Sequence, residues 1–157
     1  MQTGDLLPEF DLPTVEDQRL SDKDFRGHWS VIYFYPKDST PGCTKEAVEF
    51  SSFKAEIDAL GAKIAGVSKD SPRRHANFIS KQELTIDLIS DEEGKLCEAF
   101  GVWVEKKNYG RTYMGIERST FLFAPDGKLH KVWRKVRVAG HAEDVISTLR
   151  SSVNNQA

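Results

Sequence analysis

The sequence has few cysteines and no long apolar run. Cys43 and Cys97 are the only cysteines, and they form no Cys-x-x-Cys motif, which disfavours a dithiol–disulfide reductase. No stretch approaches the roughly 20 apolar residues of a membrane span, and the N-terminus has neither a basic start nor an apolar signal core. We therefore expect a soluble, cytoplasmic protein with no membrane association.

A strong charge of either sign is also missing. The 24 acidic and 22 basic residues give a formal charge of −2, so nothing drives the chain toward nucleic acid. There is no glycine-rich phosphate loop or dinucleotide fingerprint, and the four histidines show no metal-ligand spacing with a cysteine. No histidine is singled out for a cysteine-protease triad. We therefore expect no cofactor and no metal.

One stretch, residues 31–47, carries most of the chemical signal. Residues 31–35 are β-branched and aromatic without charge, which predicts a buried central strand. Thr40 followed by Pro41 is typical of a helix N-cap and first helical position. Cys43 is then the third helical residue, where free N–H groups and the helix dipole favour an anion. This placement predicts a nucleophilic thiolate.

The helix that follows has an apolar face. Five apolar residues recur at helical spacing and predict one helix that ends near Gly61: Ala47, Phe50, Phe53, Ile57 and Leu60. Cys43 lies one turn before Ala47 on the same face. The sequence therefore predicts a recessed thiol rather than one exposed to solvent.

Strands and helices alternate along the rest of the chain. The turn signal at residues 125–128 predicts a late antiparallel hairpin, while residues 105–117 are polar with two glycines and predict a loop or ragged hairpin. The pattern predicts an α/β sandwich with a central mixed β-sheet flanked by helices. The length suits one domain over residues 1–157, with residues 153–157 as a flexible tail.

The sequence around Cys43 resembles a known family. Pro36-x-x-x-Thr40-x-x-Cys43 is similar to the active-site signature of peroxiredoxins, and residues 34–47 resemble the Q-type, or bacterioferritin comigratory protein, subfamily. The resemblance extends from about residue 4 to about residue 149. It implies a thioredoxin-like fold and a thiol-dependent peroxidase, in which Cys43 attacks a peroxide and becomes a sulfenic acid.

The resemblance also implies supporting residues. Thr40 has a hydroxyl that can exchange hydrogen bonds with the peroxide, and Pro36 can shield the thiolate from water. Arg118, in the string Arg-Ser-Thr-Phe, resembles the second peroxiredoxin signature, whose arginine contacts the catalytic sulfur. Glu46 is expected either to orient Arg118 through an ion pair or to be a solvated helix residue.

The sequence departs from the Q-type pattern at the cysteine that would return the sulfenic acid to a thiol. Many Q-type members carry a second cysteine five residues after the first, where this chain has Val48, and others carry one on the next helix, where it has residues 78–80, Phe-Ile-Ser. Only Cys97 remains, and its apolar neighbours favour a structural role. We expect a one-cysteine cycle with an external thiol, such as thioredoxin, glutaredoxin or glutathione. A two-cysteine cycle in which Cys97 resolves is the alternative, and it requires helices to unwind.

A second function class stays open. A thioredoxin-fold binding or holdase protein could use Cys43 only to sense oxidation, without turnover. The presence of Pro36, Thr40 and Arg118 favours the peroxidase, because a sensor needs no residues that align a peroxide. The resemblance suggests a monomer.

Overall fold

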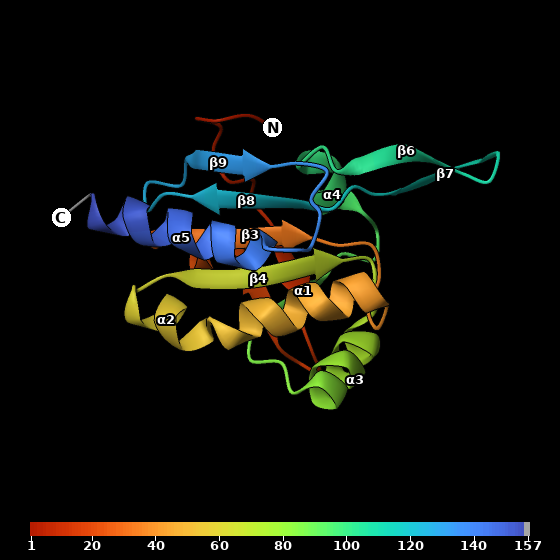
Figure 1. Cartoon of the computed structure of the whole chain (residues 1–157), viewed down its shortest axis with the longest axis horizontal. Coiled ribbons are helices and arrows are strands. Elements are labelled where there is room, and N and C mark those ends of the chain that lie inside the picture. Colours follow the sequence, from red (N-terminus) through yellow and green to blue (C-terminus); the bar gives the residue numbers. More distant parts are fainter. Residues whose placement is uncertain (156–157) are drawn as a thin grey trace.

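A mixed five-stranded sheet lies at the centre of the computed structural model, which describes residues 1–155 (Figure 1). The strand order is β5-β4-β3-β8-β9. The strands are β3 (Ser30–Phe34), β4 (Lys63–Ser68), β5 (Asp87–Ser90), β8 (Ser119–Phe123) and β9 (Leu129–Trp133). Strands β3, β4 and β5 are parallel, whereas β8 runs antiparallel to β3 and β9 antiparallel to β8. The expected α/β fold with a mixed sheet is confirmed, and β3 is its buried central strand.

Helices cover both faces of this sheet, and Figure 1 shows α1 and α5 in front of it. The helices are α1 (Pro41–Ser52), α2 (Lys54–Ala59), α3 (Pro72–Gln82), α4 (Lys95–Ala99) and α5 (His141–Asn154). One hydrophobic cluster joins α1, α2, α3 and α5 to Tyr33 of β3. A second cluster joins α4 to Phe34. Because neighbouring strand residues point to opposite faces, β3 separates two distinct cores.

The single long helix expected after Cys43 is wrong. α1 ends at Ser52 and α2 begins at Lys54, because Phe53 leaves the helical conformation with φ −97° and ψ 2°. The Ser52 hydroxyl donates to the Glu49 carbonyl (2.5 Å), a side-chain bond that competes with the backbone bonds of a helix. The apolar face survives the break, since Phe50 and Ile57 still enter the same core.

The region expected as a loop or ragged hairpin forms a regular hairpin. Strand β6 (Trp103–Asn108) pairs with β7 (Arg111–Ile116) along its full length. Tyr109 and Gly110 join them, and both have positive φ angles, the conformation of a tight two-residue hairpin turn. The hairpin projects beyond the central sheet in Figure 1.

Both ends of the chain form regular elements, and the C-terminal one differs from expectation. The N-terminal part forms a short hairpin, β1 (Asp11–Pro13) with β2 (Arg19–Ser21), followed by the 3₁₀ turn η1 (Asp22–Asp24). At the other end, the flexible tail expected from Val153 is wrong at its start, because α5 continues to Asn154 and Val153 packs against the core. Residues 156–157 of that expected tail lie outside the described residues. Among residues 1–155, no helix is long and apolar enough to cross a membrane.

Candidate active site

Cys43 lies at the third position of α1, as the N-cap and proline signals predict. Its side chain is free of any disulfide and only 2% exposed, so the expected recessed thiol is confirmed. Thr40 occupies the N-cap position with an extended backbone, but its hydroxyl does not cap the helix. It donates instead to the carbonyl oxygen of Lys37, at 2.8 Å. The first-turn N–H groups and the helix dipole still favour an anion at this end of α1.

Arg118 meets Cys43 because of the strand register. Ser119 pairs with Phe34, so Arg118, which directly precedes β8, lies beside the end of β3. The loop that leads to α1 begins at this point. Its Nη2 donates to the Cys43 Sγ at 3.3 Å, and its Nη1 donates to Glu46 Oε1 at 2.6 Å. The two nitrogens of one guanidinium therefore join the thiol to a carboxylate, an arrangement that the fork geometry of arginine allows and lysine does not.

Glu46 is buried, so of its two expected states the ion pair with Arg118 is confirmed and the solvated helix residue is wrong. Its side chain is 1% exposed, and Arg118 forms an ion pair with Oε1, while Oε2 has no hydrogen-bond partner among the described residues. Burial raises the pKa of Glu46 to about 7, and the positive charge of Arg118 opposes this shift. The carboxyl group is therefore poised to change its charge near neutral pH.

Two further residues shape the surroundings of the sulfur. A Cβ atom at Gly42 would lie 3.4 Å from Nη2 of Arg118, so the guanidinium packs directly over the first turn of α1. Lys106, on the β6–β7 hairpin, is part of the same electrostatic environment. Burial lowers the pKa of Lys106, the charge of Arg118 lowers it further, and Cys43 opposes the shift. Sequence reasoning missed Lys106 because it lies in the region read as an irregular loop.

Pro36 and Thr40 belong to the loop between β3 and α1. Pro36 is exposed directly after Tyr35, and Thr40 is half-buried. Both lie in the connection that carries Cys43. The shielding of the thiolate by Pro36 stays a prediction, as does the contact of Thr40 with a peroxide.

Cys97 lies in the other core. Its side chain on α4 is fully buried in the cluster that contains Phe34 and Phe100, and its N–H donates to Asp91 Oδ2 at 2.8 Å. Burial raises the pKa of the Cys97 thiol, and the hydrogen bond and charge of Asp91 raise it further. Because attack on another sulfur requires a thiolate, this environment suits a structural cysteine.

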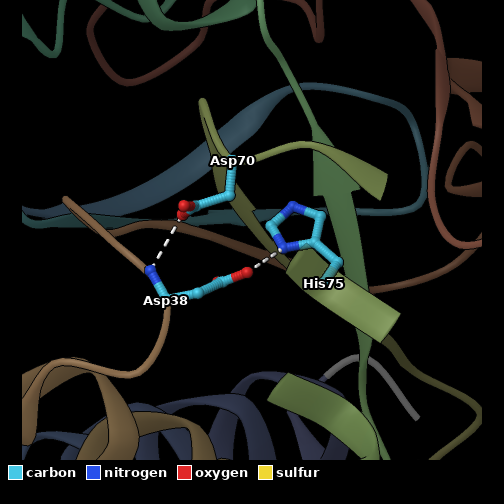
Figure 2. Close-up of side chains that lie close together, drawn as sticks. All are labelled: Asp38, Asp70 and His75. Carbon is cyan, nitrogen blue, oxygen red and sulfur yellow. Dashed lines mark hydrogen bonds and ion pairs between the residues drawn. The ribbon is translucent and has the colours of Figure 1, made fainter. Parts of the chain in front are cut away.

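One cluster of potential metal ligands occurs among the described residues. Asp38, Asp70 and His75 bring one ligand atom each within 4.8 Å of one another (Figure 2). Hydrogen bonds already engage these side chains, so we assign no metal to them. Sequence reasoning missed this cluster, because nothing local distinguishes His75 from the other histidines.

The chain matches a family model described as the AhpC/TSA family over residues 3–132. A protein named Peroxiredoxin Bcp from Xanthomonas campestris pv. campestris is 54% identical over 125 residues, which cover 80% of this chain and 78% of that protein. Peroxiredoxin Bcp from Bacillus subtilis is 45% identical over 150 residues, which cover 96% of each.

Solved structures show the same likeness. A mutant of Xylella fastidiosa PrxQ superposes with a TM-score of 0.92 at 39% identity, covering 97% of each chain. A bacterioferritin comigratory protein from Xanthomonas campestris, studied for alkyl peroxide reduction in trapped intermediate and ligand complexes, gives a TM-score of 0.87 at 47% identity, covering 92% of each chain.

Proposed function

The chain belongs to the AhpC/TSA family as a Q-type (Bcp) peroxiredoxin, a thioredoxin-fold thiol peroxidase, and from this premise we propose how its cycle runs. Cys43 reduces hydrogen peroxide and organic hydroperoxides and becomes a sulfenic acid. An external thiol then restores the cysteine, so that the cycle uses one cysteine of this chain. Thr40, Pro36, Arg118 and Glu46 support the step at Cys43.

The first step transfers one oxygen atom. The Cys43 thiolate attacks an oxygen of the peroxide, an S–O bond forms as the O–O bond breaks, and the leaving oxygen takes the electron pair and a proton as water or an alcohol. A first thiol then displaces water from the sulfenic acid and forms a mixed disulfide. A second thiol releases Cys43 and leaves as the oxidised disulfide.

The observation that carries this proposal is the contact between Arg118 and Cys43. A guanidinium that donates to the sulfur at 3.3 Å can also donate to a peroxide oxygen bound beside that sulfur, where negative charge develops as the O–O bond breaks. The buried carboxyl of Glu46 fixes the guanidinium through its other terminal nitrogen, Nη1. A cysteine that only senses oxidation has no need of such a preorganised cation.

The one-cysteine cycle is supported by the place of Cys97. Cys43 and Cys97 belong to clusters on opposite faces of the central sheet, and a disulfide needs Cα atoms within about 7 Å. A thiol from outside, such as thioredoxin, glutaredoxin or glutathione, therefore has the simpler route to the sulfenic acid. Because such thiols stay reduced in the cytoplasm, we propose a cytoplasmic enzyme. The resemblance to Q-type peroxiredoxins supports a monomer. The alkyl peroxide reduction studied in the Xanthomonas relative supports organic hydroperoxides as substrates.

Steady-state peroxide consumption with an excess of dithiothreitol tests the function. We expect continuous turnover by the wild type and none by Cys43→Ser. Consumption of one equivalent per chain and no more would refute catalysis and favour the redox-sensing alternative. Full activity of Cys43→Ser would refute the assignment of Cys43.

A further inference from the structure

A buried hydrogen-bond network holds the active-site loop, which we define as residues 36–40. Figure 2 shows its centre, where Asp38 of the loop contacts both Asp70, which follows β4, and His75 of α3. The Asp38 backbone N–H donates to Asp70 Oδ2 at 2.8 Å, and His75 Nδ1 lies 2.7 Å from Asp38 Oδ2. His75 is fully buried and Asp38 is 3% exposed. The loop is thus fixed through both its backbone and a side chain.

The partners of His75 determine where its protons lie. Nε2 lies 3.0 Å from the Ile89 carbonyl oxygen, which can only accept, so Nε2 carries a hydrogen. One further proton lies between Nδ1 and Asp38 Oδ2, and the pair is neutral overall whichever atom holds it. The Tyr35 hydroxyl donates to the remaining oxygen of Asp38 at 2.5 Å. Asp38 is thus held, directly or through His75, by buried partners that lie in, or directly beside, β3, β5 and α3, and a fully satisfied buried network of this kind restricts the loop.

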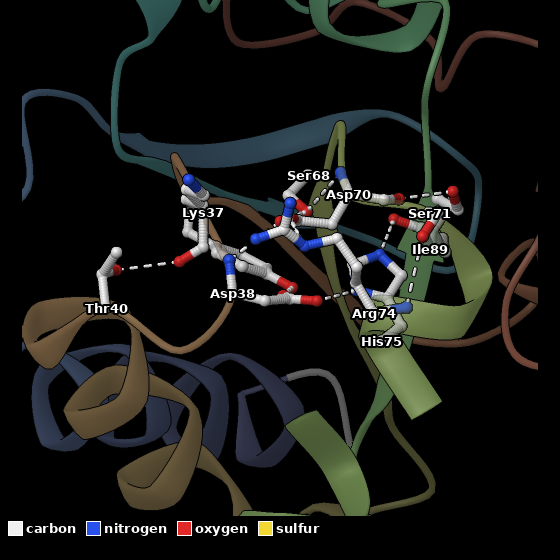
Figure 3. A network of polar contacts seen from close by, with 11 residues as sticks. Lys37, Asp38, Thr40, Ser68, Asp70, Ser71, Arg74, His75 and Ile89 are labelled. Atoms are coloured by element: carbon white, nitrogen blue, oxygen red, sulfur yellow. Dashed lines mark hydrogen bonds and ion pairs between the residues drawn. The ribbon is translucent and has the colours of Figure 1, made fainter. Parts of the chain in front are cut away.

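The Asp70 carboxylate, which accepts from the Asp38 backbone, has two further partners. Its Oδ2 also accepts from the Ser68 hydroxyl at 2.7 Å, and its Oδ1 lies 3.3 Å from Nε of Arg74. The charge of this buried carboxylate is therefore matched by a guanidinium on α3. Figure 3 shows Ser68, Asp70, Arg74 and His75 beside Asp38, on the side of the loop away from Thr40.

The network continues to Thr40 through the backbone. The carbonyl of Lys37, next to Asp38, accepts from Thr40 Oγ1 at 2.8 Å (Figure 3). Because this bond uses the only hydroxyl hydrogen of Thr40, its oxygen offers other ligands lone pairs alone. Ser39, which lies between Asp38 and Thr40, has φ 66°. Non-glycine residues adopt this conformation only where the surroundings impose it.

We propose that Asp38 and His75 are positioning residues for peroxide reduction, a role that rests on the proposed function. They hold the loop so that the Lys37 carbonyl keeps the Thr40 hydroxyl in its acceptor state, and Thr40 Oγ1 then accepts the peroxide O–H while Arg118 donates to the peroxide. One partner that only accepts and one that only donates fix the direction of the O–O bond relative to the sulfur. Asp38 occupies an unspecified position of Pro-x-x-x-Thr-x-x-Cys, and His75 lies outside that motif.

Paired variants of His75 test this role through the rate at which hydrogen peroxide oxidises Cys43 in stopped flow. The amide nitrogen of asparagine can stand near the Nδ1 position, so His75→Asn keeps a donor to Asp38. Glutamine reaches the Nε2 position, so His75→Gln keeps the bond to the Ile89 carbonyl and loses the one to Asp38. We expect His75→Gln to slow oxidation by at least about tenfold and His75→Asn to recover most of that loss. Equal rates in both variants and the wild type would overturn the proposal.

Alkylation of Cys43 by iodoacetamide separates positioning from damage to the thiol. This reaction needs the thiolate but no peroxide bound to Thr40, so His75→Gln should alkylate at nearly the wild-type rate. Circular dichroism confirms that each variant is folded at the temperature of the assay. A parallel loss of both reactions in a folded His75→Gln would overturn the positioning role.

A double-mutant cycle shows whether His75 acts through Thr40. Thr40→Val removes the hydroxyl, and adding His75→Gln to it should cause little further loss of the peroxide rate, because coupled residues are not additive. A full, additional loss would overturn the proposal. Tyr35→Phe, which removes only the donor to Asp38 Oδ1, replaces His75→Gln in the same cycle if the latter does not fold.

The wild type separates failure of this role from failure of the function. If wild-type Cys43 does not react with peroxide, the proposed function is refuted. If the wild type reacts and the His75 and Tyr35 variants react equally fast, only the positioning role is refuted.

Discussion

Cys43 and Cys97 lie on opposite faces of the central sheet. Cys43 packs in the cluster that contains Tyr33, and Cys97 packs in the cluster that contains Phe34, the next residue of β3. The backbone of the sheet therefore stands between the two sulfurs. A disulfide between them would require one of the two cores to open.

We predict that Cys97 is dispensable for the peroxide step. Cys97→Ala should oxidise at the wild-type rate and turn over with dithiothreitol. After one equivalent of peroxide, intact mass should show one added oxygen atom in both proteins. Loss of two hydrogen atoms in the wild type, absent in Cys97→Ala, would instead demonstrate a Cys43–Cys97 disulfide and a two-cysteine cycle.

Arg118→Lys should keep the charge and lose most of the activity. An ammonium group cannot donate to Glu46 and to the Cys43 sulfur in the same fixed geometry as the guanidinium. Loss of one preorganised donor to a developing charge typically slows a reaction by about 10²–10³-fold, and we expect that range for the rate constant of Cys43 oxidation. Arg19→Lys, in an exposed ion pair with Asp11, is the matched control, and a wild-type rate in Arg118→Lys would contradict the prediction.

Glu46 should make the stability of the fold depend on pH. Its pKa is raised from 4.5 to about 7 in the folded protein, so the folded state binds the proton more tightly than the unfolded state. This contribution is fully present below pH 4.5 and is lost as the pH rises through about 7. We expect it to amount to about 3 kcal/mol of the free energy of unfolding.

Urea unfolding of the wild type and Glu46→Gln across this pH range isolates the effect of Glu46. The variant does not titrate at this position, so groups distant from Glu46 cancel in the difference between the two curves. The stability of the wild type relative to the variant should fall with rising pH. A difference that stays constant with pH would show that Glu46 keeps an ordinary pKa in the folded protein.

Gly66→Ala should destabilise the fold. A Cβ at Gly66 would lie 2.7 Å from Cζ of Tyr33 and 3.0 Å from Cδ2 of Leu88, and overpacking of this kind costs about 1–3 kcal/mol. Gly115→Ala is the control within a strand, because its nearest neighbour is the flexible side chain of Lys106 at 3.2 Å. In thermal unfolding, the midpoint temperature of Gly66→Ala should lie well below that of Gly115→Ala. Equal midpoints would contradict the clash.

Local signals account for the part of the site that the sequence predicts. The apolar run of β3, the Thr40–Pro41 pair and the dipole of α1 are properties of neighbouring residues, so the strand, the loop and the position of Cys43 follow from the sequence. The same reasoning fails at Phe53, where a single residue breaks the helix without changing its apolar spacing.

The sequence by itself determined that a thiol stands at the start of a helix beside a buried strand. Apart from the Arg118 contact that the family resemblance implied, only the tertiary structure decided what surrounds the thiol. Arg118 reaches Cys43 across 75 residues, and His75 reaches Asp38 across 37. The first contact depends on the pairing of β8 with β3 and the second on the place of α3 beside the sheet, and no pattern of neighbouring residues encodes either. The same packing placed the second cysteine in the other core.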